Sequence, residues 1–178
     1  MNVILVLDNI RSTGNVGSIL RTADGFGVSK VVFSGVTPRV DDERLLPHLR
    51  EKINKQIEKT ALGAEKYVEK YACDDKFFEL KDLKEKGYTI VGLENNICSK
   101  KLIPLCSSNF YNISERIGEK VVIVLGEEVG GIKNSLYDII DLFLEIPMEG
   151  KKESFNVSIA TGIVLFALRE IFELSCKS

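Results

Sequence analysis

The stretch Val121-Val-Ile-Val-Leu-Gly-Glu-Glu-Val-Gly-Gly131 passes from five apolar residues directly into a turn rich in glycine. This pattern predicts a buried strand of a parallel sheet, followed by a ligand-binding loop at its carboxyl end. The turn is neither GxGxxG nor a phosphate loop, and Glu127 and Glu128 would repel a pyrophosphate. The sequence favours a neutral or cationic ligand, or a carboxylate pair with an arginine such as Arg21. The alternative is a plain turn that uses glycine for its conformation.

Apolar and polar segments alternate along the rest of the chain. We expect further strands at residues 3–7, 30–34, 89–93 and 142–146, and helices at residues 15–26, 43–60, 78–86 and 156–174. Strands separated by helices predict an α/β fold with a parallel sheet. The chain has 178 residues and no linker, repeat or low-complexity segment, so we expect one domain over residues 1–178.

The composition narrows the class of protein. A hydrophobic content of 44% and a charged content of 28% are typical of soluble globular proteins. No apolar run is long enough to span a membrane, and the N-terminus lacks the basic start of a signal peptide, so we expect a cytoplasmic protein. The four cysteines form no CxxC pair and accompany a single histidine, His48. No metal site is therefore predicted.

A net charge of −2 argues against a surface coated in basic charge for nucleic-acid binding. Basic residues nevertheless crowd residues 39–59, where acidic residues are interleaved with them. This segment is either a local nucleic-acid-binding patch or a solvated helix of mixed charge.

The first expected helix carries an unusual stripe beside its apolar face. The stripe consists of Gly14, Gly17, Ser18, Arg21 and Gly25. A glycine inside a helix costs about 1 kcal/mol relative to alanine, so the stripe predicts the close approach of another chain or of a ligand. Asn15 and Arg21 become candidate site residues. The alternative is that Asn15 caps the helix and Arg21 is an ordinary surface arginine.

The last expected helix is apolar on nearly every side. A terminal helix of this kind must be covered from more than one direction, and a second subunit is the simplest cover. We therefore predict a homodimer through this helix. Ser154 is expected to cap the helix, and Asn156 to lie in its first turn.

Three segments together resemble the ordered motifs of the SpoU/TrmH family of RNA 2′-O-ribose methyltransferases, in the SPOUT superfamily. They are Asn15-Val-Gly-Ser-Ile-Leu-Arg21, Leu125-Gly-Glu-Glu-Val-Gly-Gly131 and Ile146-Pro-Met-Glu-Gly-Lys-Lys-Glu-Ser-Phe-Asn-Val-Ser-Ile-Ala160. The resemblance spans essentially the whole chain. It implies a parallel α/β sheet whose C-terminal part threads a loop into a trefoil knot, and a dimer in which the second subunit's residues reach the active site.

The resemblance also implies a cofactor, S-adenosylmethionine. Its binding residues would be Leu93, Gly126, Ile146 and Phe155, mainly through backbone groups, with Ser154 nearby. Phe155 stands where the family usually has leucine or methionine. No phosphate loop is needed, because this cofactor carries no phosphate.

The catalytic residues that the resemblance implies are Arg21, Asn15, Glu128, Ser154 and Asn156. Arg21 would act on the ribose 2′-hydroxyl and the adjacent phosphate, and the others would arrange the site. Because the pKa of arginine lies above about 12, we expect Arg21 to clamp the phosphate and stabilise the developing alkoxide rather than to act as the base.

The predicted activity is methylation of a ribose 2′-hydroxyl in structured RNA. Transfer RNA is favoured because the chain is compact, and ribosomal RNA is the alternative. RNA contacts are expected from residues 39–59, Lys100, Lys101, Lys151 and Lys152. Two other hypotheses are a non-catalytic RNA-binding protein of the same fold and a nucleotide-binding oxidoreductase of Rossmann type. The absence of GxGxxG counts against the latter.

Overall fold

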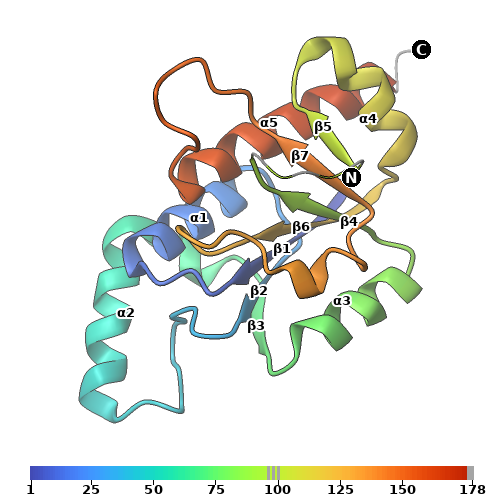
Figure 1. Cartoon of the computed structure of the whole chain (residues 1–178). Coiled ribbons are helices and arrows are strands. Elements are labelled where there is room, and N and C mark those ends of the chain that lie inside the picture. The colour runs from blue at the N-terminus through green and yellow to red at the C-terminus, as the bar shows by residue number, and fades with distance from the viewer. Residues whose placement is uncertain (96, 98, 100, 176–178) are drawn as a thin grey trace.

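The computed structural model describes residues 1–95, 97, 99 and 101–175, and within them one parallel sheet of seven strands. The strand order is β3-β2-β1-β6-β4-β7-β5, and every neighbouring pair is parallel (Figure 1). The strands are β1 (Asn2–Asp8), β2 (Lys30–Ser34), β3 (Lys70–Cys73), β4 (Thr89–Leu93), β5 (Leu102–Pro104), β6 (Lys120–Leu125) and β7 (Leu142–Glu145). The predicted fold class, a parallel α/β sheet, is confirmed.

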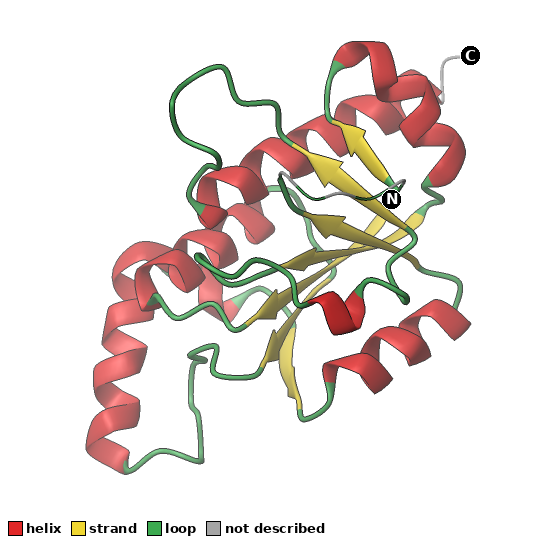
Figure 2. Ribbon diagram, viewed as in Figure 1, coloured by secondary structure: helices red, strands yellow, loops and turns green. Residues whose placement is uncertain are grey.

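Helices cover both faces of this sheet (Figure 2). The α-helices are α1 (Thr13–Gly25), α2 (Pro47–Ala61), α3 (Lys76–Glu85), α4 (Phe110–Arg116) and α5 (Val157–Ser175). Three single-turn 3₁₀ helices, η1 (Ala64–Lys66), η2 (Ser107–Asn109) and η3 (Asn134–Leu136), complete the described elements. Helices α1, α2, α4 and α5 share one core cluster, while α3 and η3 pack on the other face.

The central strands are apolar throughout because both of their faces are buried. Leu5 of β1 and Ile123 of β6 point toward α1 and α5, whereas Ile4 and Val122 point toward α3. Successive residues of a strand face opposite sides of the sheet, so a strand covered on both sides reads as a continuous apolar run.

The two edge strands and α4 were not predicted, whereas the strands at residues 30–34 and 89–93 match at both ends. Every residue of β3 is only half-buried, and β5 has three residues, so neither shows a continuous apolar run. The helix expected over residues 43–60 begins only at Pro47, which occupies its first turn. Proline suits that position because the first amides of a helix have no partner within it.

Helix α2 of the same chain makes the close approach at one position of the glycine stripe, Gly17, whereas a Cβ on Gly25 would meet nothing within 4 Å. A Cβ placed on Gly17 would lie 2.1 Å from Oγ1 of Thr60 and 2.3 Å from the carbonyl oxygen of Ile57. The Thr60 hydroxyl also donates to the carbonyl oxygen of Gly14 at 3.0 Å. Glycine at position 17 therefore fixes α2 tightly against α1.

Two further predictions concern the chain as a whole. Within the part of the chain that the structure describes, no helix combines the length and apolarity needed to cross a membrane. The trefoil knot that the resemblance implies stays a prediction.

Candidate functional site

A pocket of about 480 Å³ lies where β4, β6 and β7 end at the same edge of the sheet. Its walls are the segments that follow these strands and the first turn of α5. All five residues expected to bind a cofactor line it: Leu93, Gly126, Ile146, Ser154 and Phe155. The structure thus brings together residues that lie far apart in the sequence, at the edge where parallel sheets bind ligands.

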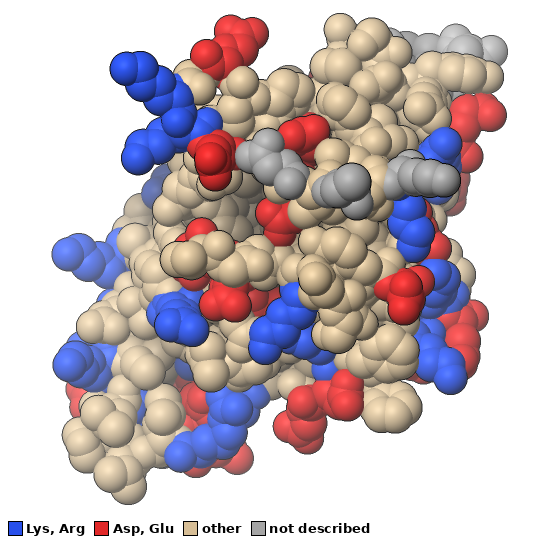
Figure 3. Space-filling view, viewed as in Figure 1, with Lys and Arg blue, Asp and Glu red and all other residues tan. Residues whose placement is uncertain are grey.

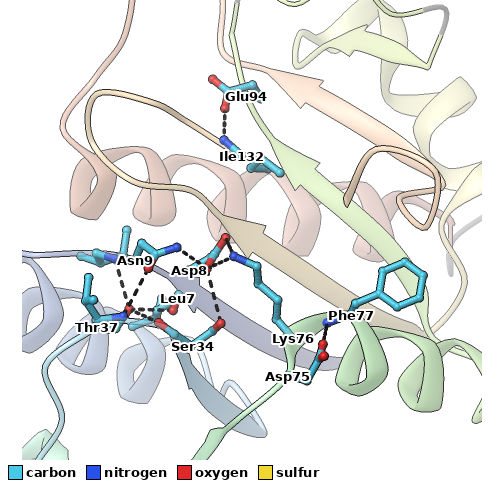
Figure 4. Close-up of polar contacts among 12 residues, drawn as sticks. Leu7, Asp8, Asn9, Ser34, Thr37, Asp75, Lys76, Phe77, Glu94 and Ile132 are labelled. Atoms are coloured by element: carbon cyan, nitrogen blue, oxygen red, sulfur yellow. Dashed lines mark hydrogen bonds and ion pairs between the residues drawn. The ribbon is translucent and has the colours of Figure 1, made fainter. Parts of the chain in front are cut away.

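The glycine turn after β6 requires its glycines. A Cβ on Gly126 would lie 2.3 Å from the carbonyl carbon of Gly131, and Gly131 itself has a φ of +63°. The backbone N–H of Ile132 donates to a carboxylate oxygen of Glu94 at 2.7 Å (Figure 4). The turn is therefore narrow and is anchored to the end of β4. Glycine serves both close packing and a left-handed conformation here.

Asn95 joins three segments of the pocket wall, and sequence reasoning did not identify it. Its side-chain oxygen accepts from the backbone N–H of Ile146 at 3.1 Å, and its amide nitrogen donates to the carbonyl oxygens of Ile146 at 2.9 Å and Glu153 at 3.2 Å. The feature of the sequence that could have indicated Asn95 as a site residue is the polar pair Glu94-Asn95 directly after an apolar strand. Its partners became visible only in the folded chain.

Asn15, Glu128 and Asn156 form a connected polar cluster at the pocket. The Asn15 amide donates to Glu128 at 3.0 Å, and the Asn156 amide donates to the side-chain oxygen of Asn15 at 3.1 Å. Asn15 is not the helix cap, because the hydroxyl of Ser12 accepts from the backbone N–H of Asn15 and caps α1. Its side chain is therefore available to the cluster.

The Glu128 carboxylate is stabilised in its charged form. Burial alone would raise its pKa, but hydrogen bonds outweigh this effect and lower the pKa. The donors are its own backbone N–H, the Asn15 amide and the backbone N–H groups of Arg11 and Ser12. Glu128 is thus an anion that fixes the amide of Asn15.

Two expectations for individual residues are wrong. Among the described residues, no hydrogen bond or ion pair joins Arg21 to Glu127 or Glu128; Arg11 instead approaches Glu127 at 3.5 Å. Arg21 is exposed on α1, about 9 Å along the helix from Asn15. Sequence periodicity gives the face on which a residue lies, but not which other segment reaches that face.

Ser154 does not cap the last helix. The helix begins at Val157, and the Asn156 side-chain oxygen accepts from the backbone N–H of Ser158 at 2.9 Å and from its hydroxyl at 2.7 Å. Asn156 is therefore the cap, and its amide nitrogen remains directed at Asn15. Ser154 is an exposed residue of the pocket wall.

The charge of the pocket is negative. Carboxylates of Glu94, Glu127, Glu128 and Glu153 line it, and no lysine or arginine occurs among the described lining residues. Figure 3 shows acidic side chains around this part of the surface. Such a lining suits a ligand that is neutral or cationic and opposes a polyphosphate.

A second polar network, which sequence reasoning missed, closes the adjacent ends of β1 and β2 (Figure 4). Asp8 is 1% exposed, and the ammonium of Lys76 lies 2.6 Å from both of its oxygens. Thr37 accepts from the backbone N–H of Ile10 and donates to the carbonyl oxygens of Leu7 and Ser34. The network fixes the exit of β1 toward α1.

Comparison with known proteins gives consistent results. A family model described as the SpoU rRNA Methylase family matches residues 2–166. The 23S rRNA (guanosine-2′-O-)-methyltransferase RlmB of Nitrosomonas europaea is 32% identical over 164 residues, which cover 92% of this chain and 54% of that protein. The chain spans 54% to 65% of the lengths of the first curated relatives that it matches.

Solved structures share the fold. A TrmH/SpoU tRNA modifying enzyme of A. aeolicus superposes with a TM-score of 0.74 at 26% identity, covering 98% of this chain and 77% of that one. An AdoMet-bound rRNA methyltransferase from Sinorhizobium meliloti gives a TM-score of 0.73 at 22% identity, with coverages of 95% and 56%.

Proposed function

Since this chain belongs to the SpoU rRNA methylase family, we propose that it transfers a methyl group from S-adenosylmethionine to a ribose 2′-hydroxyl of RNA. The observation that carries the proposal is the Asn15–Glu128–Asn156 cluster beside an acidic pocket. These residues come from all three motifs.

The residues of the pocket fit this cofactor. Leu93, Leu125, Ile146 and Val157 offer apolar surface to an adenine ring, and the carboxylates around them suit a molecule with a sulfonium and an ammonium group. Gly126 lies against Gly131, so backbone groups rather than side chains form this wall. When bound, S-adenosylmethionine supplies an activated methyl group.

The chain's own residues position the RNA and stabilise charge. Glu128 fixes the Asn15 amide, and Asn15 in turn accepts from Asn156, which holds the two helix starts in a set orientation. The guanidinium of Arg21 clamps an RNA phosphate and stabilises negative charge that develops on the 2′-oxygen. Ser154, exposed on the pocket wall, contributes a hydroxyl near the cofactor.

A homodimer through α5 completes the proposal. One face of α5 is buried, but Ile159 is 54% exposed and Phe166 is 57% exposed. With Gly162 and Ile163 between them, these residues lie on one stripe, because positions three or four apart share a helix face. A Cβ on Gly162 would lie 3.9 Å from the side chain of Thr22, which follows Arg21 in α1, so this part of α1 borders the stripe. Pairing through α5 would bring Arg21 toward the second subunit, as the resemblance implies.

The remaining expectations follow from the same family. We propose that residues 1–178 form a single SpoU-type domain with a trefoil knot in its C-terminal part. The strands of one sheet come from residues 2–145, which supports the single domain. Cys73 and Cys106 are free thiols, which fits a reducing cytoplasm.

Two RNA classes are candidate substrates. Transfer RNA is one, and the similarity to a tRNA modifying enzyme supports it. Ribosomal RNA is the second candidate, because the relative that is 32% identical is a 23S rRNA methyltransferase.

The test is transfer of labelled methyl groups from S-adenosylmethionine to RNA that lacks 2′-O-methylation, separated into tRNA and rRNA. Label in an alkali-resistant dinucleotide is the expected result, since a 2′-O-methyl group blocks alkaline cleavage. The non-catalytic RNA-binding protein predicts RNA binding without label. The oxidoreductase predicts binding of a nicotinamide dinucleotide, which the acidic pocket disfavours.

A further inference from the structure

The structure separates the basic residues expected to contact RNA into bound and available groups. Asp42, which is 4% exposed, lies 2.7 Å from the guanidinium of Arg44 and 3.3 Å from that of Arg39. Hydrogen bonds from Arg44 hold the pKa of Asp42 at about 2, so this carboxylate stays charged and engages both arginines in ion pairs. Lys100 lies outside the described residues.

Lys101 is also engaged within the protein. Its ammonium donates to the carbonyl oxygens of Tyr137 at 3.1 Å and Ile140 at 2.6 Å. An RNA phosphate would have to compete with both of these bonds. Lys101 therefore serves to close the segment before β7.

The lysines of α2 are different. His48, Lys52, Lys55 and Lys59, which we call the basic face of α2, recur every three or four residues and line a shallow groove of about 380 Å³. All four are exposed. Figure 3 shows basic side chains at the edge of the molecule that α2 forms. The face extends about 16 Å along the helix.

Among the described residues that line this groove, one, Glu51, carries a carboxylate. Glu51 lies 2.7 Å from the ammonium of Lys55, and both side chains are about two-thirds exposed. An exposed pair of this kind contributes little to stability, so it leaves Lys55 open to exchange partners. Within the described part of the chain, no ion pair engages Lys52 or Lys59. The groove keeps an excess of positive charge in a chain whose net charge is −2.

The basic face is joined rigidly to the candidate site. Gln56 in the same groove accepts a hydrogen bond from the hydroxyl of Thr13 at 3.3 Å, and Thr13 lies two residues before Asn15. The contact of Gly17 with Thr60 fixes the other end of the interface between α1 and α2. The groove therefore lies beside the start of α1.

We propose that the basic face of α2 is an RNA-docking surface that contacts phosphates of the segment flanking the target nucleotide. The inference rests on the proposed function for the identity of the partner. Charge complementarity supports RNA as the partner: three lysines and one histidine line the groove against one glutamate, and Gln56 in the groove accepts a hydrogen bond from Thr13, two residues before Asn15. Lysines contact phosphates without reading sequence, so this surface supplies affinity and orientation.

The test compares two double variants of equal charge. Lys52→Ala/Lys59→Ala removes charge from the groove, and Lys81→Ala/Lys86→Ala removes the same charge from α3 and the residue that follows it, on the opposite face of the sheet. Binding of bulk tRNA and of fragmented rRNA is measured across a range of salt concentrations. The α2 variant should flatten the slope of log K against log salt by about 1.5 and weaken binding near 0.15 M salt about tenfold. The α3 variant should match the unsubstituted protein.

Two controls separate the surface from the activity. Both variants should bind S-adenosylmethionine and unfold as the unsubstituted protein does, because neither pair of lysines touches the pocket or the core. Equal slopes for all three proteins, or equal loss in both double variants, would overturn the docking surface. Methyl transfer that fails in the unsubstituted protein, together with a slope change confined to the α2 variant, would refute the activity and leave the surface standing.

Discussion

The Asn156 amide donates to the side-chain oxygen of Asn15 at 3.1 Å and so joins two residues that lie 141 positions apart. One belongs to the first turn of α1 and the other caps α5. The bond links the first motif to the third, and Glu128 of the second motif completes the chain of contacts. The proposed catalytic site is thus a meeting point of two helix starts rather than a feature of one loop.

Asn156 performs two tasks that substitution can separate. Asn156→Asp keeps an oxygen that caps α5 but loses the amide that donates to Asn15. We expect methyl transfer to fall about 100-fold with little change in thermal stability, because the helix cap is retained. Asn156→Ala should lose the cap as well, at a cost of about 1 kcal/mol in the free energy of unfolding. Equal stability losses in both variants would show that the carboxylate is not an adequate cap.

Gly126 should tolerate no side chain. In Gly126→Ala, the new Cβ would lie 2.3 Å from the backbone of Gly131, so the turn must shift and the pocket wall with it. We expect binding of S-adenosylmethionine, measured by titration calorimetry, to weaken at least tenfold. Gly118→Ala is the matched control, because a Cβ there meets nothing within 4 Å. Normal cofactor affinity in Gly126→Ala would show that this backbone does not form the cofactor site.

The exposed stripe of α5 makes a prediction about assembly. Phe166→Glu places a charge on the proposed dimer interface, where Phe166 is 57% exposed in a single chain. Burying an unpaired carboxylate is costly, so we expect monomers in sedimentation velocity where the unsubstituted protein is a dimer. Phe78→Glu on α3 is the control, because Phe78 is 67% exposed on the other side of the sheet. A monomeric unsubstituted protein would refute the dimer directly.

Asp42 predicts a specific dependence of stability on pH. Its folded pKa of about 2 lies below the ordinary value of 3.8, so its stabilising effect is complete above pH 3.8 and disappears as the pH falls through 2. In urea unfolding at neutral pH, Asp42→Asn should lower the free energy of unfolding by about 2 kcal/mol. The difference between the two proteins should shrink between pH 4 and pH 2. A difference that stays constant over this range would mean that packing, not charge, accounts for the loss.

The sequence predicted the centre of the sheet better than its edges. The strands at residues 30–34 and 89–93 were correct because strands covered on both faces need continuous apolar residues. The edge strand β3 has one partner and stays half-buried, so Lys70 and Tyr71 gave no such signal. A run of apolar residues therefore predicts a strand that is buried on both faces, but it does not predict a strand that is only partly buried.

The site divides in a similar way. Sequence reasoning, through the resemblance to the family's motifs, identified Asn15, Glu128 and Asn156, which the folded chain brings into contact. It did not identify Asn95, because the bonds of Asn95 to the backbone of Ile146 and Glu153 depend on loops that return from other strands. It also assigned the arginine near the glutamates to Arg21 rather than Arg11, since helical periodicity does not specify which loop crosses the strand ends.

The contacts of Asn95 have a consequence for how the pocket responds to a ligand. Because one side chain holds the ends of β4 and β7 and the segment before α5, these parts can open only together. A bound ligand would slow amide exchange in all of them as one cooperative unit. The edge strand β3, which contributes nothing to the pocket, would keep its own faster exchange. Within one continuous sheet, a ligand would then slow amide exchange on the side of β4 and β7 and leave the exchange of β3 unchanged.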